Sequence, residues 1–264
     1  MNTIKSAKNV TGTKEWAAKN ANCISGCSHD CFYCYAKAIA IRFRRKTAQN
    51  WKNEIVLGAK PVGGKPCRVM FPTTHDITPN TLPVCMDQIQ LIRDGGHEIL
   101  IVSKPHLECI AAICERFKDY KNKILFRFTI GSASNATLKL WEPGAPSFDE
   151  RLASLRLAHR LGFATSISCE PMLDGNIDAV VKQVEPYVTD SIWLGKMNQV
   201  KARLTFNRAP KEVVQAAEVL MQEQCDENIQ ALYQRFKANP KIKWKDSIKK
   251  VVGIEAPKAI GLDI

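Results

Sequence analysis

Three closely spaced cysteines are the residues of this chain best suited to chemistry. Cys27, Cys31 and Cys34 lie in the run CSHDCFYC, with the spacing C-x3-C-x-aromatic-C and with Tyr33 just before the last cysteine. Three thiolates can hold a cubane iron–sulfur cluster while one iron keeps no protein ligand. Electron-transfer clusters are normally closed by four cysteines. The spacing therefore predicts an open iron that can bind a small molecule and pass it one electron.

Two other uses of the cysteines compete with this interpretation. Cys23 brings four cysteines within twelve residues, which would suit a four-cysteine zinc site. Zinc ribbons usually carry two separated C-x2-C pairs, however, and only one pair here has that spacing. A disulfide framework is disfavoured because the ten cysteines are spread over 264 residues and the first residues, MNTIKSAKNVTGTKEW, form no apolar signal segment. We therefore expect a reducing, cytoplasmic location.

The run CSHDCFYC resembles the cluster loop of the radical S-adenosylmethionine (SAM) superfamily. The resemblance implies that Cys27, Cys31 and Cys34 hold a [4Fe–4S] cluster and that Tyr33 lies beside the adenine of SAM. In that family the methionine moiety of SAM chelates the open iron, and an electron cleaves the sulfonium to release a 5′-deoxyadenosyl radical. The electron would come from an external one-electron reductant of the flavodoxin or ferredoxin type.

Apolar, β-rich runs alternate with helical stretches after this loop. We expect strands at 67–72, 97–104, 123–131, 163–171 and 191–197, and a further short strand near 18–24. The expected helices cover 36–46, 80–94, 106–119, 147–161 and 174–186, and Ser147 with Glu150 gives one of them a capping-box pattern. Continuous apolar strands separated by helices favour an α/β fold with a parallel sheet.

Six such β units match the partial (β/α)6 TIM-type barrel that the resemblance implies. Residues 1–204 would form this barrel, with the cluster loop at 23–36. The pattern of residues 205–264 is purely helical, which predicts a C-terminal helical extension packed on the barrel. No window approaches eighteen uninterrupted apolar residues, so no membrane span is expected.

Polar residues follow each expected strand, and in parallel barrels functional groups gather at the carboxyl ends of the strands. Lys104 suits the SAM carboxylate, because its ammonium is a compact charge with three donors. The remaining cofactor-binding candidates are Ser132 and Ser134 for the ribose, with Asn135 as a neighbour; Thr73, Thr74 and Asp76, where the family usually receives the SAM ammonium; and Glu170. The run at Thr73 departs from the glycine-rich, acid-ended run of many members. Glu170 could instead pair with Lys196 or Arg127.

A second stretch, LWEPGAPSFDERLASLRLAHRLGFATSISCEPML, is similar to spore photoproduct lyase-like proteins and to phage-encoded radical SAM proteins of the Gp37/Gp68 type. With the cluster loop, the resemblance covers roughly residues 20–200. Spore photoproduct lyase splits a thymine dimer, and a cysteine returns a hydrogen atom. Cys169, at a strand end, could be such a donor, or a buried structural thiol. Tyr35 could relay a hydrogen or stack on SAM.

The chain carries a net charge of +12 and has a pI near 9.3, which favours a polyanionic partner such as nucleic acid. Nine basic residues and one acid lie between Lys37 and Arg68, and seven basic residues and one acid between Arg235 and Lys250. Trp244, within the second stretch, could stack on a base or plug the core. We therefore expect a radical SAM enzyme acting on a nucleic acid base or nucleotide. A peptide or small-metabolite substrate and a zinc-stabilised nucleic-acid-binding module are the alternatives.

Overall fold

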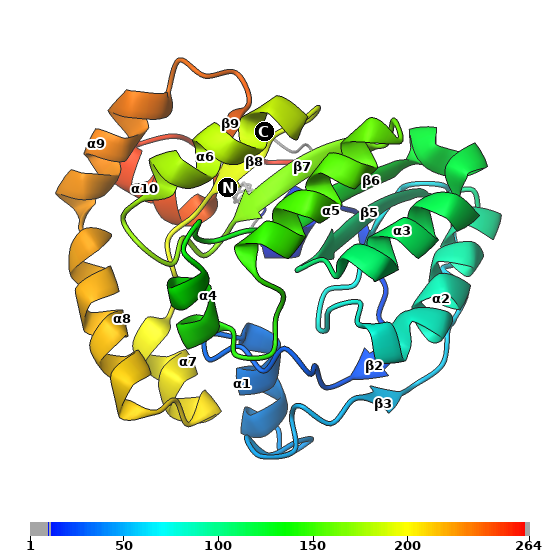
Figure 1. Cartoon of the computed structure of the whole chain (residues 1–264), viewed down its shortest axis with the longest axis horizontal. Helices are drawn as coiled ribbons and strands as arrows, with labels where there is room; N and C mark the ends of the chain where they lie inside the picture. The colour runs from blue at the N-terminus through cyan, green and yellow to red at the C-terminus, as the bar shows by residue number, and fades with distance from the viewer. Residues whose placement is uncertain (1–9, 11, 262–264) are drawn as a thin grey trace, which may run out of the picture.

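A parallel sheet is the central element of the computed structural model, which describes Val10 and residues 12–261 (Figure 1). Seven strands lie side by side in chain order, and every neighbouring pair is parallel. They are β1 (Lys19–Asn20), β4 (Arg68–Phe71), β5 (Glu98–Ser103), β6 (Ile124–Thr129), β7 (Ala164–Cys169), β8 (Ile192–Leu194) and β9 (Ile242–Trp244). The expected α/β fold with a parallel, barrel-type sheet is thus confirmed.

Helices connect successive strands, as the right-handed parallel crossover requires. They are α2 (Leu82–Asp94), α3 (Leu107–Arg116), α4 (Asn135–Trp141), α5 (Phe148–Arg160) and α6 (Ile177–Val184), with 3-10 turns at Gly12–Glu15, Pro79–Thr81, Lys118–Lys123 and Glu185–Tyr187. The Ser147 hydroxyl accepts a hydrogen bond from the backbone N–H of Glu150 at 3.2 Å, so the predicted start of α5 is correct. Gly162, at φ 78°, follows the end of that helix.

The cysteine loop lies between a small antiparallel pair and a short helix. The pair is β2 (Ile24–Ser25) with β3 (Ile55–Val56), and the helix is α1 (Tyr35–Arg42). Gly26 begins the loop at φ 97°, and a Cβ there would lie 2.5 Å from the backbone oxygen of Trp51. Only glycine fits this turn, because it has no Cβ and adopts positive φ without strain.

The C-terminal segment is mainly helical, as expected, but it also contains a strand. Helices α7 (Val200–Asn207), α8 (Lys211–Glu223), α9 (Asp226–Phe236) and α10 (Asp246–Val252) surround β9, which pairs with β8 and extends the sheet. The prediction of a purely helical pattern was therefore wrong at residues 242–244. The predicted boundary after residue 204 falls inside α7.

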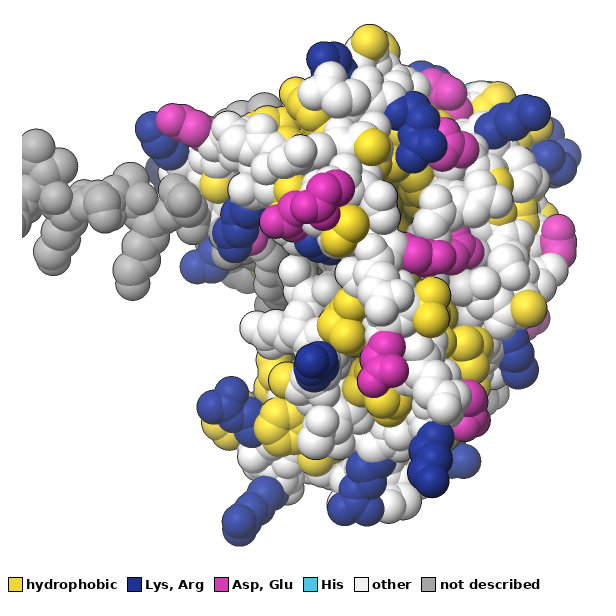
Figure 2. Space-filling view, turned by 90° about the vertical axis from the view of Figure 1, so that its left-hand side faces the viewer, with side chains coloured by type: hydrophobic (Ala, Val, Ile, Leu, Met, Phe, Trp, Pro, Cys, Tyr) yellow, Lys and Arg dark blue, Asp and Glu magenta, His cyan; other side chains and the backbone are white. Residues whose placement is uncertain are grey.

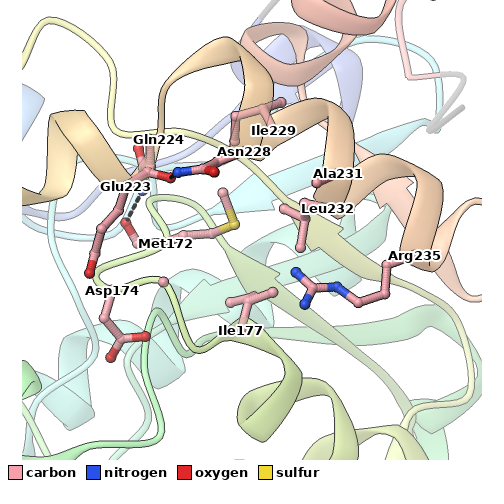
Figure 3. A pocket seen from close by; sticks show the side chains of 11 residues that line it. Met172, Asp174, Ile177, Glu223, Gln224, Asn228, Ile229, Ala231, Leu232 and Arg235 are labelled. Carbon is pink, nitrogen blue, oxygen red and sulfur yellow. Dashed lines mark hydrogen bonds between the residues drawn. The ribbon is translucent and has the colours of Figure 1, made fainter.

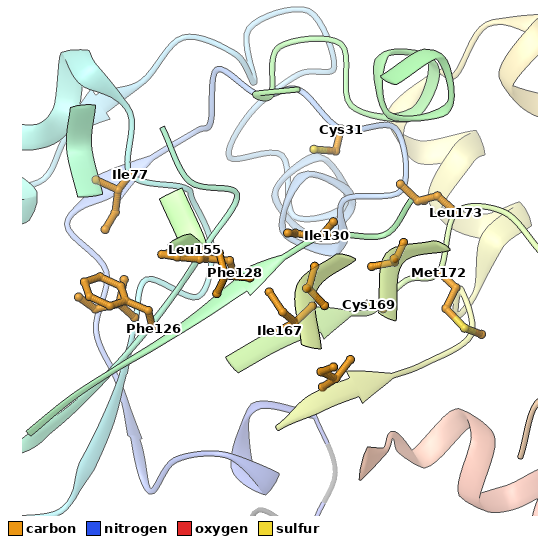
Figure 4. Close-up of a cluster of buried hydrophobic side chains, with 14 of the residues drawn as sticks. Cys31, Ile77, Phe126, Phe128, Ile130, Leu155, Ile167, Cys169, Met172 and Leu173 are labelled. Carbon is orange, nitrogen blue, oxygen red and sulfur yellow. The ribbon is translucent and has the colours of Figure 1, made fainter. Parts of the chain in front are cut away.

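The core is built from the strands and the inner helix faces. Figure 4 shows Phe126, Phe128 and Ile167 on the strands, and Cys31 of the cysteine loop belongs to the same buried cluster. Among the described residues, no helix is both long and apolar enough to cross a membrane. Residues 1–9 and 11, which make up most of the polar N-terminal run, lie outside the described residues.

Candidate active site

The three cysteines of the loop CSHDCFYC lie in a largely buried part of the fold. Cys27 and Cys31 are buried and Cys34 is half-buried, and all ten cysteines are free. The Cys34 sulfur caps α1 and accepts a hydrogen bond from the backbone N–H of Lys37 at 3.4 Å. The start of α1 thus fixes the third cysteine; burial raises the pKa of Cys34, and the hydrogen bond from the Lys37 backbone N–H lowers it in part.

The electrostatics of the loop show that the three thiols face one region. Burial raises the pKa of Cys27 well above its ordinary value, and the nearby Asp76 carboxylate and the sulfurs of Cys31 and Cys34 raise it further. Burial also raises the pKa of Cys31, and the Lys104 ammonium lowers it in part. Three free thiols that penalise one another's ionisation beside a cation are a suitable donor set for a cluster bound by three thiolates.

Asp76 ties the loop to the ends of β4 and β5. Its carboxylate accepts hydrogen bonds from the Ser103 hydroxyl at 2.9 Å and from the Lys104 backbone N–H at 2.7 Å, and it lies 2.9 Å from Nδ1 of His29. Burial would raise the pKa of Asp76, but the Lys104 ammonium and His29 hold it well below its ordinary range. Asp76 therefore stays ionised, and its Oδ2 lies 3.8 Å from the Cys27 sulfur.

Lys104 is the cation beside the three cysteines. Its Nζ lies 3.6 Å from Asp76 Oδ2 and 5.7 Å from the centroid of the Tyr33 ring. Burial would lower the pKa of Lys104, but Asp76, Cys31 and Tyr33 raise it well above its ordinary value. The ammonium stays charged beside the three sulfurs, where it can attract a carboxylate.

Tyr33 is hydrogen-bonded to a buried ion pair that the sequence pattern did not reveal. Its hydroxyl donates to Glu142, whose other carboxylate oxygen pairs with Arg151. Both side chains of this pair are completely buried, and the guanidinium also donates to the carbonyls of Pro146 at 2.9 Å and Thr129 at 3.1 Å. The pair anchors the aromatic residue of the cysteine loop to the start of α5.

The run E-P-G-A-P-S, residues 142–147, begins with Glu142 of this ion pair and packs on the cysteine loop. Gly144 donates its backbone N–H to the carbonyl of His29 at 3.0 Å, and a Cβ at position 144 would collide with the backbone oxygen of Ser28. The segment therefore packs directly on the cysteine loop, and glycine is required at the closest approach. The sequence signal was the motif itself, but its role becomes visible only in the contacts.

Threonines 73 and 74 follow β4 and are half-buried. The backbone N–H groups of Thr73 and Thr74 donate to the side-chain oxygen of Asn22 at 2.8 and 2.9 Å, and the Thr73 hydroxyl accepts from the Asn22 amide at 2.7 Å. Asn22 thus links the end of β4 to the chain just before the cysteine loop. Thr73, Thr74 and Asp76 follow the same strand, as predicted.

The three residues after β6 are held by polar contacts of the fold. Ser132 is completely buried, and its hydroxyl donates to Asp174 and accepts from the backbone N–H of Ser134 at 2.9 Å. Ser134 caps α4. Asn135 joins α4 to α5 by donating to Asp149 at 2.8 Å and accepting from Phe148 N–H at 2.7 Å.

The two predicted hydrogen donors lie in different surroundings. Cys169 ends β7 and is completely buried, so burial raises its pKa and keeps the thiol protonated. Tyr35 is 38% exposed at the start of α1, its hydroxyl donates to the carbonyl of Thr73, and burial of the hydroxyl end raises its pKa to about 12.

Glu170, the next residue after β7, has a partner that the sequence did not suggest. Lys245, just after β9, places its Nζ 3.5 Å from Glu170 and 3.2 Å from Glu15. The predicted alternatives were wrong, because Lys196 pairs with Asp226 and Arg127 with Asp190. The charge on Glu170 is therefore already balanced from the C-terminal segment.

The second basic stretch is largely a structural element. Trp244 lies on β9, is only 8% exposed and packs against Tyr233, so the core interpretation of this side chain is correct and the stacking interpretation is wrong. Lys245 and Lys249 are buried as well.

Cys23 has other neighbours than the three loop cysteines. Its sulfur lies 3.8 Å from that of Cys85 and 4.0 Å from Nε2 of His75.

A cavity of about 520 Å³ lies between the loop after β7 and helices α8 and α9 (Figure 3). Met172, Asp174, Glu223 and Arg235 are among the side chains that line it, and Gln224 donates to the carbonyl of Met172 at 2.9 Å. None of the site residues predicted from the sequence lines this cavity. The predicted site residues therefore lie outside this cavity.

Comparison with known proteins decides the family. A family model described as the radical SAM superfamily matches residues 21–183, which is more than half of the chain. The chain belongs to the radical SAM superfamily. It is accordingly an enzyme of a family that uses a [4Fe–4S] cluster and SAM, so the family and the cofactors expected from CSHDCFYC are confirmed, while the roles of the individual residues stay predictions.

Solved radical SAM structures share its fold. Spore photoproduct lyase complexed with dinucleoside spore photoproduct has a TM-score of 0.53 at 15% identity, over 91% of this chain and 79% of that chain. SuiB of Streptococcus suis bound to S-adenosylmethionine has a TM-score of 0.54 at 10% identity, over 92% of this chain and 54% of SuiB. This radical SAM chain thus spans about half the length of SuiB. A sequence search of curated proteins finds no significant match.

Proposed function

We propose that this radical SAM enzyme cleaves SAM reductively and uses the resulting radical on a nucleic acid base or nucleotide. The observation that supports the chemistry is the buried loop of three free thiols beside the Lys104 ammonium, at the carboxyl ends of parallel strands. The net charge of +12 supports a polyanionic substrate. A peptide substrate is the competing outcome.

Cys27, Cys31 and Cys34 would hold the cluster in this proposal. When bound, the [4Fe–4S] cluster supplies the electron that splits the sulfonium of SAM into methionine and a 5′-deoxyadenosyl radical. Lys104 binds the SAM carboxylate, because its ammonium stays charged and lies near the three sulfurs. Asp76 holds Lys104 and His29 in place, and with Thr73 and Thr74 it forms the side of the pocket that receives the SAM ammonium.

The other residues orient the cofactor or supply hydrogen. Tyr33, fixed by Glu142, forms the adenine side, and Ser132, Ser134 and Asn135 the ribose side. Glu170 lies at the next strand end, where it pairs with Lys245. Cys169 and Tyr35 are the candidate hydrogen-atom donors, since both keep their proton at neutral pH. An external flavodoxin- or ferredoxin-type protein provides the electron, and a cytoplasmic location stays a prediction.

Anaerobic reconstitution with iron and sulfide tests this proposal. We expect a brown protein with about four irons per chain, and 5′-deoxyadenosine on reduction in the presence of SAM. Cys27→Ser should abolish both signals, whereas Cys23→Ser should keep them, because Cys23 contacts Cys85 and His75. A wild-type protein that stays colourless after reconstitution contradicts the chemistry.

The substrate is tested by mass spectrometry on the same preparations. Oligonucleotides and peptides of matched length are offered separately with reduced enzyme and deuterated SAM. A mass change or deuterium transfer in the oligonucleotide supports the proposal. The same change in the peptide alone would replace the nucleic acid by a peptide substrate.

A further inference from the structure

Helix α1, which starts at the third cysteine, exposes a row of apolar side chains. Tyr35, Ile39 and Phe43 are 38, 46 and 60% exposed, and their spacing of four residues puts them on one face. A soluble domain seldom leaves such a row in water without a binding partner. The row begins beside Cys34, so whatever covers it lies next to the cluster.

Arginines surround the outer end of this row. The guanidinium groups of Arg42 and Arg45 lie 5.8 and 5.6 Å from the centroid of the Phe43 ring, and no acidic residue occurs between Tyr35 and Asn53. Cations at the rim of an exposed ring attract a partner that offers both negative charge and a flat face.

Helix α7 continues the surface on its other side, and Figure 1 shows α1 and α7 next to each other. Asn207, at the end of α7, donates its side-chain N–H groups to the carbonyls of Phe32 at 2.7 Å and Cys34 at 3.0 Å. Phe206 is 40% exposed, and α7 contains no acidic residue. Figure 2 shows Lys and Arg side chains along the lower edge of the molecule, where Figure 1 places α1, α7 and α8.

Arg203 marks the inner end of this surface. It lies one helical turn before Asn207, on the same face of α7, and is half-buried. Cys34, Glu170 and Tyr35 are near enough to influence its charge, and burial lowers its pKa. In the part of the chain that the structure describes, no carboxylate or other acceptor lies within ion-pair or hydrogen-bond distance of the guanidinium. A partly desolvated guanidinium of this kind is suited to an anion brought in by a ligand.

We propose that these residues form a binding surface for a single-stranded or locally unpaired nucleic acid. The surface, named here the α1–α7 surface, consists of Tyr35, Ile39, Phe43, Arg45, Arg203 and Phe206. A base stacks on Phe43, Arg45 neutralises a neighbouring phosphate, and Arg203 takes the phosphate nearest the cluster.

The residue types distinguish this partner from others. An acidic protein would need cations but not the exposed rings, and a second copy of the chain would bring the same positive charges and be repelled. In a duplex the faces of the bases are already stacked on one another inside the helix. Exposed aromatic rings can therefore stack only on unpaired bases. The inference rests on the proposed function, since it names where the nucleic acid substrate of that reaction lies.

Fluorescence anisotropy with a labelled single-stranded 12-mer, using reconstituted enzyme over a range of salt, tests the surface. Phe43→Ala should weaken binding roughly tenfold or more, and Phe43→Trp should restore it. Arg45→Ala should make the slope of log K against log salt shallower by about 0.7, the loss of one phosphate contact in a single strand. Lys182→Ala, which removes an exposed charge from α6, should leave the slope unchanged for a strand bound at α1 and α7.

Arg203 is tested with a matched ligand pair, a dinucleotide and its uncharged methylphosphonate. Wild-type enzyme should prefer the charged phosphate by roughly tenfold or more, and Arg203→Gln should lose the preference. If Phe43→Ala and Arg45→Ala behave like Lys182→Ala, or if a polyglutamate peptide displaces the 12-mer from wild type and Phe43→Ala equally, the nucleic acid assignment is overturned.

Formation of 5′-deoxyadenosine in the same samples separates this inference from the proposed function. Phe43→Ala and Arg45→Ala should keep the cleavage of SAM in the absence of substrate. Normal cleavage with unaffected oligonucleotide binding refutes the surface alone. Absent cleavage in the wild type refutes the chemistry, while the binding comparison still decides the surface.

Discussion

Replacing Arg151 by methionine should destabilise the protein more than any exposed substitution. The change leaves the Glu142 carboxylate, which is completely buried, without its cation. Removing one partner of a buried ion pair costs roughly 3–5 kcal/mol, and the carbonyls of Pro146 and Thr129 also lose a donor. Since domains are stable by about 5–15 kcal/mol, we expect the midpoint of urea unfolding to fall by about a fifth or more.

Urea unfolding of the reduced, cluster-free protein, followed by tryptophan fluorescence, measures this cost. The double variant Glu142→Gln, Arg151→Met should recover part of it, because the buried charge is gone while the amide oxygen still accepts from Tyr33. Arg160→Met, at the exposed end of the same helix, should change stability by about 0.5 kcal/mol or less. A loss below about 1 kcal/mol for Arg151→Met, or a double variant no more stable than the single one, would refute the reasoning.

Two further substitutions test how the cysteine loop is held. Gly144→Ala should lower the iron content after reconstitution, because the new Cβ collides with the backbone of Ser28, whereas Gly63→Ala, with open space around it, should not; equal iron content in both variants would contradict the contact. Asn207→Ala should make the bound cluster more sensitive to oxygen, because two loop carbonyls lose donors at a cost of about 1–3 kcal/mol. The decay of the cluster absorbance in air measures this, with the exposed Asn228→Ala as control, and identical decay rates would exclude the anchoring role.

The strands that could be predicted from the sequence are those that lie within apolar runs. β5, β6 and β7 have six residues each and lie inside the predicted ranges. β9 was missed because its residues, Ile242–Trp244, are set among lysines, and it is stabilised by pairing with β8 about fifty residues earlier. Short strands depend on their neighbours more than on their own pattern.

Closeness in the sequence also decides which of the site residues could be predicted. Cys27, Cys31 and Cys34 are close in sequence, so their spacing was sufficient to propose a shared site. Glu142 and Arg151 were visible only as parts of a longer motif. Their meeting depends on the turn between α4 and α5, which spacing alone does not specify.

The C-terminal segment contributes to the site directly. Lys245 neutralises Glu170 and Glu15, which lie in the barrel part of the sequence, and Asn207 satisfies two carbonyls of the cysteine loop. Without these groups Glu170 and Glu15 would lose a cation, and the carbonyls of Phe32 and Cys34 would each lose a hydrogen-bond donor, which is costly in a largely desolvated region. We therefore infer that the segment after residue 204 is needed to hold the cysteine loop as well as to extend the sheet.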